Sequence, residues 1–122
     1  MTDLTQLEFR SGCPIAATLD IIGDKWTLLI IRDMLVGRTR YHEFLASPEG
    51  ITTNILASRL KRMEEIGLIA RTRYQEHPPR FDYALTELGR SLHPVLQAIC
   101  RWANAQIPDT WTPPASFMET GR

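Results

Sequence analysis

The side chains best suited to contact another molecule lie in positions 51–68, ITTNILASRLKRMEEIGL. When this stretch is wound as a helix of about 100° per residue, one side collects small, polar and cationic side chains. They are Thr53, Asn54, Ala57, Ser58 and Lys61. Asn, Ser, Thr and Lys offer donors and acceptors that suit base edges and phosphates, and short side chains allow a close approach. An ordinary solvated helix face has the same composition, so the neighbouring residues must decide.

The same stretch carries the signals of a helix with defined ends. Thr52 suits the N-cap, where a hydroxyl accepts from a free N–H one turn later. Gly67 suits the left-handed residue that commonly ends a helix. The side of the helix opposite the polar residues is apolar and is predicted to be buried: Ile55, Leu56, Leu60 and Met63.

The charge is distributed unevenly along a chain of 122 residues whose formal net charge is zero. Residues 38–80 carry 8 basic and 5 acidic side chains, which makes them +3, whereas residues 1–37 are −2 and residues 81–122 are −1. Phosphate binding depends on the local surface, so a neutral total does not exclude a nucleic-acid partner. The length suits one compact domain.

Three helices are predicted before residue 51. Pro14 begins a short helix that Gly23 ends, residues 25–36 form a second helix capped by Asp24, and residues 41–46 form a third. Residues 47–50 (SPEG) are a tight turn rich in helix breakers. A short helix, a glycine-containing turn and a capped helix follow one another, which is the layout of a helix-turn-helix.

A basic β-hairpin is predicted directly after that motif. Residues 68–75 and 81–85 are rich in β-forming side chains, and Phe81, Tyr83 and Leu85 alternate onto one face. The arms and tip carry Arg71, Arg73, His77 and Arg80. A hairpin in this place is the wing of a winged helix, which can lie along the DNA backbone or in the minor groove. The alternative is that exposed arginines only discourage edge-to-edge aggregation.

The last predicted helix begins at Thr86 and Glu87, and Pro94 should kink or split it. An apolar stripe along it is predicted to pair with a second copy of the chain, with packing into the chain's own core as the alternative. The stripe contains Leu92, Val95, Leu96, Ile99 and Trp102. Residues 1–12 are predicted to be a flexible N-terminal arm, 13–106 the folded domain, and 107–122 an extended or disordered tail.

These features together resemble the HxlR-type winged helix-turn-helix transcriptional regulators. The matching stretches are CPIAATLDIIGDKWTLLIIRDMLVGRTRYHEF, GITTNILASRLKRMEEIGLIARTRYQEHPPRFDYALTELGRSL and HPVLQAICRW, within residues 13–102. The resemblance implies a mainly α fold with a small β-hairpin wing and a small dimeric DNA-binding protein that dimerises through its terminal helices. Thr39 and Asn54 stand at positions where the family often carries basic or other polar side chains. This departure concerns which operator sequence is recognised and not whether the protein binds DNA.

Resemblance and helical wheel agree on the side chains that would enter a DNA groove: Thr53, Asn54, Ser58 and Lys61. Asn54 could read adenine through paired hydrogen bonds, and Lys61 would meet guanine or phosphate. Further cations are expected at phosphates or in the minor groove: Arg38, Arg40, Arg71, Arg73 and Arg80.

Two cysteines are too few for a disulfide scaffold, so a cytoplasmic protein with reduced thiols is expected. Cys13 would lie at the N-cap of the first helix, where the helix dipole favours a thiolate. In HxlR-type proteins a cysteine near the N-terminus sometimes senses oxidants or electrophiles, and the resemblance assigns that role to Cys13. The alternative is a small buried residue beside the dimer helix, as expected for Cys100.

An enzyme is not expected, because His42, His77 and His93 are scattered and no phosphate-binding loop or nucleophile motif is present. No metal or cofactor is predicted, and no segment resembles an export signal or membrane span. The sequence predicts a homodimeric repressor on an inverted-repeat operator, with a small-molecule or thiol-reactive effector as a further possibility. The second interpretation is a winged-helix module for protein interaction or ligand sensing without DNA binding.

Overall fold

The computed structural model of the protein describes residues 4–119. It is mainly helical and contains one two-stranded antiparallel sheet in this range. The elements are η1 (Leu4–Gln6), α1 (Pro14–Ile22), α2 (Thr27–Leu35), α3 (Tyr41–Leu45), α4 (Thr53–Ile66), β1 (Ile69–Gln75), β2 (Arg80–Leu85), α5 (Glu87–Arg90), α6 (His93–Gln106) and α7 (Ala115–Glu119).

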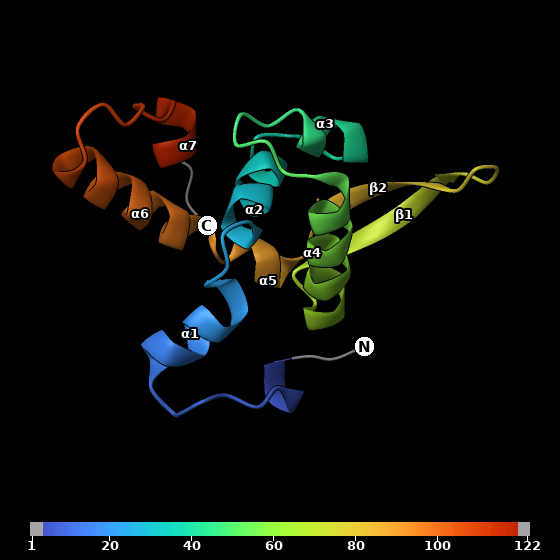
Figure 1. Cartoon of the computed structure of the whole chain (residues 1–122). Helices are drawn as coiled ribbons and strands as arrows, with labels where there is room; N and C mark the ends of the chain where they lie inside the picture. The colour runs from blue at the N-terminus through green and yellow to red at the C-terminus, as the bar shows by residue number, and fades with distance from the viewer. Residues whose placement is uncertain (1–3, 120–122) are drawn as a thin grey trace.

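Helices α3 and α4 form the predicted helix-turn-helix, and α4 leads into the hairpin (Figure 1). The Thr52 hydroxyl accepts a hydrogen bond from the Ile55 N–H, and Gly67 ends the helix with a φ of 95°. Both predicted ends of this helix are therefore confirmed. The phenol of Tyr41 donates to the Thr53 carbonyl over 3.1 Å, which links the first turns of the two helices.

The hairpin projects away from the helices, as Figure 1 shows. Its register pairs Ile69 with Leu85 at the base, and an irregularity lies between Arg73 and Gln75. The alternation predicted for β2 is confirmed, because Tyr83 and Leu85 are buried and Phe81 is half-buried. The Tyr83 N–H donates to the Thr39 carbonyl, so the segment before α3 runs along the outer side of β2. This fold is a winged helix.

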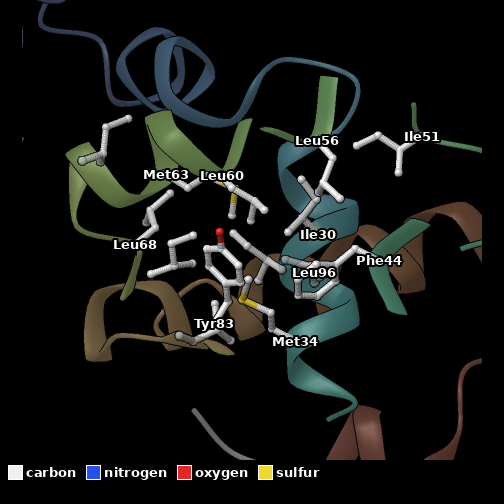
Figure 2. Packing of buried hydrophobic residues seen from close by; sticks show 14 of the residues in the cluster. Ile30, Met34, Phe44, Ile51, Leu56, Leu60, Met63, Leu68, Tyr83 and Leu96 are labelled. Atoms are coloured by element: carbon white, nitrogen blue, oxygen red, sulfur yellow. The ribbon is translucent and has the colours of Figure 1, made fainter. Parts of the chain in front are cut away.

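The core lies where α2, α4 and the base of the hairpin meet (Figure 2). Helix α4 contributes Leu56, Leu60 and Met63, which are all buried as the apolar periodicity predicts. Ile55, the fourth predicted member, is only half-buried. The ring of Phe44 from α3 meets that of Tyr83 from β2 edge to face at 6.3 Å between centroids. The wing and α4 thus share one core.

The C-terminal part follows the sequence prediction in one respect and differs in another. The long helix is split into α5 and α6, as predicted, and Pro94 lies in the first turn of α6, where its missing N–H is harmless. The tail was expected to be extended or disordered from residue 107 onward, but residues 115–119 form α7 and bury Phe117. Of the predicted arm 1–12, residues 1–3 lie outside the described range, and Leu4 and Leu7 pack against the core.

Gly89 has no room for a side chain, which gives a test of how α5 packs. A Cβ at this position would lie 2.2 Å from the Leu68 carbonyl oxygen and 2.9 Å from a methyl of Leu85. We expect Gly89→Ala to lower the free energy of unfolding by about 2 kcal/mol, since overpacking outweighs the gain in helix propensity. Urea unfolding followed by circular dichroism measures this.

Gly12→Ala is the matched control, because a Cβ there meets nothing within 4 Å. It should change the unfolding free energy by no more than about 0.5 kcal/mol. Equal stability of the two variants would contradict the packing described for α5.

Candidate nucleic-acid interface

The outer face of α4 presents the four groove-facing side chains that the sequence predicts. Thr53, Asn54, Ser58 and Lys61 are all exposed on this helix. Lys61 forms no ion pair within residues 4–119, so its ammonium group is available to an anionic partner. The first carboxylate along the helix is Glu64, whose charge is balanced by Arg71 at 3.3 Å. Apart from the small Ala57, the exposed face from Thr53 to Lys61 is therefore polar, and it is free of negative charge.

Two further arginines of α4 hold the helix to α1 and to the turn between α1 and α2. Arg59 Nε lies 2.9 Å from a carboxylate oxygen of Asp24, and Arg62 donates to the Asp20 carbonyl over 2.9 Å. Sequence reasoning did not single out either residue. Their positions on the helical wheel, beside the outer face, could have drawn attention to them. Their partners could not be predicted, because these lie 35 and 42 residues away in the sequence.

The carboxylate of Asp24 also orders the start of α2. It accepts hydrogen bonds from the Thr27 hydroxyl and from the N–H groups of Trp26 and Thr27. Burial opposes the negative charge, but these bonds and the one from Arg59 outweigh burial and lower the pKa of Asp24. One side chain thereby fixes the first turn of α2 and the middle of α4.

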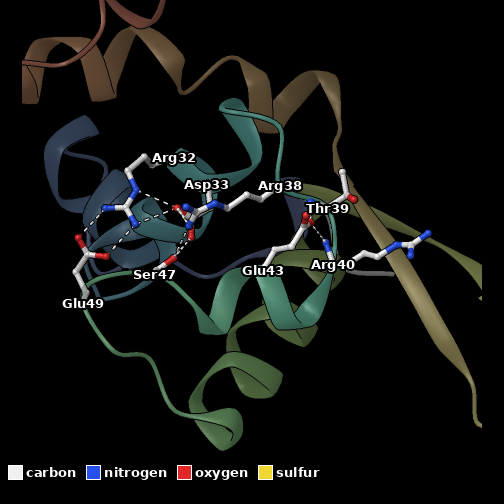
Figure 3. A network of polar contacts seen from close by, with 8 residues as sticks. All are labelled: Arg32, Asp33, Arg38, Thr39, Arg40, Glu43, Ser47 and Glu49. Atoms are coloured by element: carbon white, nitrogen blue, oxygen red, sulfur yellow. Dashed lines mark hydrogen bonds and ion pairs between the residues drawn. The ribbon is translucent and has the colours of Figure 1, made fainter.

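A second carboxylate, Asp33, fixes the turn between α3 and α4 (Figure 3). Its side chain is buried, and it accepts a short hydrogen bond from the Ser47 hydroxyl and a bond from Arg32 at 2.9 Å. Arg38 lies 3.5 Å from Asp33 and donates to Ser47 over 3.2 Å. A buried carboxylate needs such partners, because an unpaired buried charge is strongly destabilising.

Arg32 extends this arrangement to the end of the turn. It binds Glu49 with two nitrogen atoms, at 2.7 and 2.9 Å. The hydrogen bonds to Glu49 and Asp33 raise the pKa of Arg32, and the bond from Arg32 lowers the pKa of Glu49 despite partial burial. Both ends of the turn before α4 are thus bound to α2.

The carboxylate of Glu43 orders the start of α3. Glu43 accepts from the N–H groups of Thr39 and Arg40 at 2.8 and 2.9 Å, which lowers the pKa of its carboxyl (Figure 3). The Arg40 side chain points the other way. Its Nε lies 2.8 Å from Asp82 of β2, and its guanidinium group lies 3.8 Å from the ring centroid of Tyr74.

The arginines of the wing also have partners on the wing or beside it. Arg71 meets Glu64 and lies over the Phe81 ring at 4.2 Å, and Arg73 lies 3.0 Å from Glu76. Arg80, by contrast, forms no ion pair in the described part of the chain. Of the five predicted phosphate contacts, Arg38, Arg40, Arg71 and Arg73 are therefore held by acids of the chain, and Arg80 is not.

The apolar stripe predicted for dimer contact is divided between the two sides of α6. Leu96 is only 7% exposed and belongs to the core of its own chain, which corrects its assignment to an interface. Leu92 and Val95 are half-buried, and Leu92 packs against the core. Ile99 and Trp102 are 47% and 64% exposed. Only the C-terminal half of the stripe is open to a partner.

Cys13 occupies the N-cap position of α1, as predicted, and its side chain is exposed. Cys100 is half-buried on α6. Within residues 4–119, His, Cys, Asp and Glu side chains form no group of three or more that could hold a metal ion. No helix in the same range is long and apolar enough to cross a bilayer.

Comparison with known proteins identifies helix-turn-helix regulators as similar in sequence. The family model for HxlR-like helix-turn-helix proteins matches residues 21–110. The HTH-type transcriptional regulator YybR of Bacillus subtilis, itself uncharacterized, is 35% identical over 96 residues, which are 79% of this chain and 77% of that protein.

Solved structures give the same result. The redox regulator HypR in its oxidized form superposes with a TM-score of 0.69 at 35% identity, over 77% of this chain and 97% of that one. The reduced form of the transcriptional regulator YodB from B. subtilis has a TM-score of 0.66 at 29% identity, over 83% of this chain and 100% of that one.

The lowered pKa of Asp24 predicts a pH-dependent contribution to stability. Because its pKa is lower in the folded state, the carboxylate stabilises the fold above its ordinary pKa of about 4, and the stabilisation disappears as the pH falls through the folded value. At pH 7 we expect Asp24→Asn to cost roughly 1 kcal/mol of unfolding free energy. That difference should shrink as the pH falls below about 4, as denaturant unfolding at each pH would measure.

The exposed Asp109, which forms no ion pair in the range described, provides the control. Asp109→Asn should follow the wild type at every pH. A constant difference between Asp24→Asn and the wild type from neutral to acid pH would contradict the role given to this carboxylate.

Proposed function

The chain belongs to the HxlR-like helix-turn-helix family of transcriptional regulators, and from this premise we propose that it binds double-stranded DNA sequence-specifically, as a homodimeric repressor on an inverted-repeat operator. The observation that carries the proposal is the exposed face of α4, which is polar and free of carboxylates from Thr53 to Lys61. YybR and YodB are named as transcriptional regulators and HypR as a redox regulator, which supports a regulatory role.

In this proposal α4 lies in the major groove and its short side chains allow close approach. Asn54 forms paired hydrogen bonds with an adenine edge, and Lys61 contacts guanine or a phosphate. Thr53 and Ser58 add contacts to base edges or phosphates near the first turns of the helix. The anchors at Asp24 and Asp33 support this arrangement, because they fix the helix in one orientation.

The wing and the segment before α3 supply phosphate or minor-groove contacts. Arg80 is available without rearrangement. Arg40, Arg71 and Arg73 would exchange or share their acidic partners, and the exposed side chains make this exchange inexpensive, whereas Arg38 would contact a phosphate while it stays beside the buried Asp33. Surface ion pairs contribute only about 0–1 kcal/mol each, whereas phosphate contacts also gain from counterion release.

Dimerisation would use the open part of the apolar stripe together with α1. Ile99 and Trp102 of α6 are exposed, and so are Ile15 and Leu19 of α1. Exposed apolar side chains on two terminal helices support a contact with a second copy. Two α4 helices related by a two-fold axis would then enter successive major grooves about one helical turn apart. Repression needs no further surface, because the bound dimer blocks the promoter by occupying it.

DNA duplexes tiled across the region upstream of the gene test this proposal by fluorescence anisotropy at several salt concentrations. One tile should bind tightly with a steep salt slope. Lys61→Ala should reduce the preference for that tile by about 1 kcal/mol. Arg80→Ala should weaken all tiles alike and reduce the salt slope by about 1.

Arg101→Ala is the control, since Arg101 is exposed on α6, away from α4 and the wing. Its affinities should equal those of the wild type. Uniformly weak binding of every tile by a folded dimer would argue against the proposal and favour a winged helix that binds a protein partner.

We further propose that Cys13 senses oxidants or electrophiles. Its exposure at the N-cap of α1 supports this role, and the neighbour HypR is described as a redox regulator. Treatment with iodoacetamide should change the operator affinity of the wild type and of Cys100→Ser by about fivefold or more, because a modified α1 would alter the dimer. Cys13→Ser should not respond, and an equal response of this variant would refute the role of Cys13.

A further inference from the structure

A groove of about 960 Å³ lies between α2, α6 and the C-terminal segment that leads into α7. Its lining is largely apolar and includes Leu29, Val36, Ile99, Ala103, Trp111 and Phe117. Trp111 is 77% exposed, so its ring is available to a molecule in the groove. This volume is in the range of sites that bind drug-sized ligands.

The C-terminal wall of the groove is held by specific hydrogen bonds. The Phe117 carbonyl lies 2.9 Å from His93 Nε2 and accepts from the Gln97 amide at 3.0 Å, and both side chains are buried. Asn104 donates to the Thr110 hydroxyl and to the Trp111 carbonyl at 2.8 and 3.0 Å. A wall that is already fixed lowers the entropy cost of binding.

The charged residues of the groove indicate the charge of its ligand. Asp24 is bound by Arg59, and Asp33 is bound by Arg32 and Arg38, so these two carboxylates are already neutralised. Lys25, just before α2, forms no ion pair in the described chain and is exposed beside the apolar wall. Its ammonium group lies 5.3 Å from the ring centroid of Trp26 and has no acidic partner there, so it can pair with an anion.

Asp109 also lines the groove without an ion pair in the described residues, but it follows α6 rather than α2. The α2 side of the groove therefore has an available cation, and an acid lies at the other wall. We propose that the groove binds a small planar aromatic carboxylate, with its ring on the apolar wall and its carboxylate at Lys25.

Helix α2 connects this groove to α4. One part of α2 lines the groove, while Asp24 binds Arg59 of α4 and Arg32 and Asp33 bind the turn before it. A ligand that displaces α2 would therefore displace the outer face of α4 and change DNA affinity. This regulatory consequence rests on the proposed function, whereas ligand binding itself does not.

Isothermal titration calorimetry of the full chain with 2-naphthoate tests the site in the absence of DNA. Lys25→Gln should weaken 2-naphthoate binding about fivefold or more. The uncharged 2-naphthamide should bind the wild type at least as weakly as 2-naphthoate binds Lys25→Gln, because either change removes the ion pair. Lys61→Gln is the matched control and should bind 2-naphthoate like the wild type. Ala103→Trp, shown to be folded by circular dichroism, should abolish binding by filling the groove.

Several results would overturn the assignment. One is the absence of any heat of binding at about 1 mM 2-naphthoate, and another is an unchanged affinity for 2-naphthoate in Lys25→Gln. A third is tighter binding of the cationic 2-naphthylmethylamine than of 2-naphthoate, which would give Asp109 the leading role. If 2-naphthoate does not bind and Ala103→Trp converts a dimer to a monomer in sedimentation, the groove holds a second copy instead.

The DNA measurement separates the two proposals. Saturating 2-naphthoate should change operator affinity by about fivefold or more, and an unchanged affinity would refute the coupling through α2. A protein that binds 2-naphthoate as expected but binds no DNA would contradict the proposed function and still support the site.

Discussion

The buried carboxylate of Asp33 is the constraint on which the placement of α4 depends. It is 3% exposed, and removing an unpaired charge from water costs several kcal/mol, so its burial requires donors close by. Ser47 and Arg38 meet that need from the two ends of α3, and Arg32 meets it from the adjacent position on α2. The helix-turn-helix is therefore organised around a charge as well as around an apolar core. Asp24 repeats the principle at the other end of α2, where Arg59 is its partner.

The elements that the sequence predicts correctly are those determined by neighbours in the chain. The ends of α4 follow from Thr52 and Gly67, and the buried side of β2 follows from strict alternation. The exposed face of α4 could be predicted for the same reason, since a helix of known ends and apolar side leaves only one side for the polar residues.

The remaining features depend on contacts between distant residues. Arg40 meets Asp82 across 42 positions, and nothing local in either residue indicates that pairing. The apolar stripe of α6 has the right period for a helix, but the period does not reveal which members face the chain's own core. Leu96 and Ile99 differ in that respect although both fit the pattern. The fold of the tail depends on Phe117 reaching the core, which a segment rich in proline does not suggest.

The C-terminal segment is attached mainly through its backbone. His93 and Gln97 bind the carbonyl oxygens of Phe117 and Met118, and Asn104 binds that of Trp111. Carbonyl oxygens are the same in every amino acid, so the attachment constrains the path of the segment but hardly its composition. Exposed side chains there, such as Trp111 at 77% exposure, can differ while the path is kept, whereas the Thr110 hydroxyl and the core residues Phe117 and Met118 take part in the attachment. Relatives with the same DNA-binding core could therefore acquire different effector preferences through drift in one short, tolerant segment.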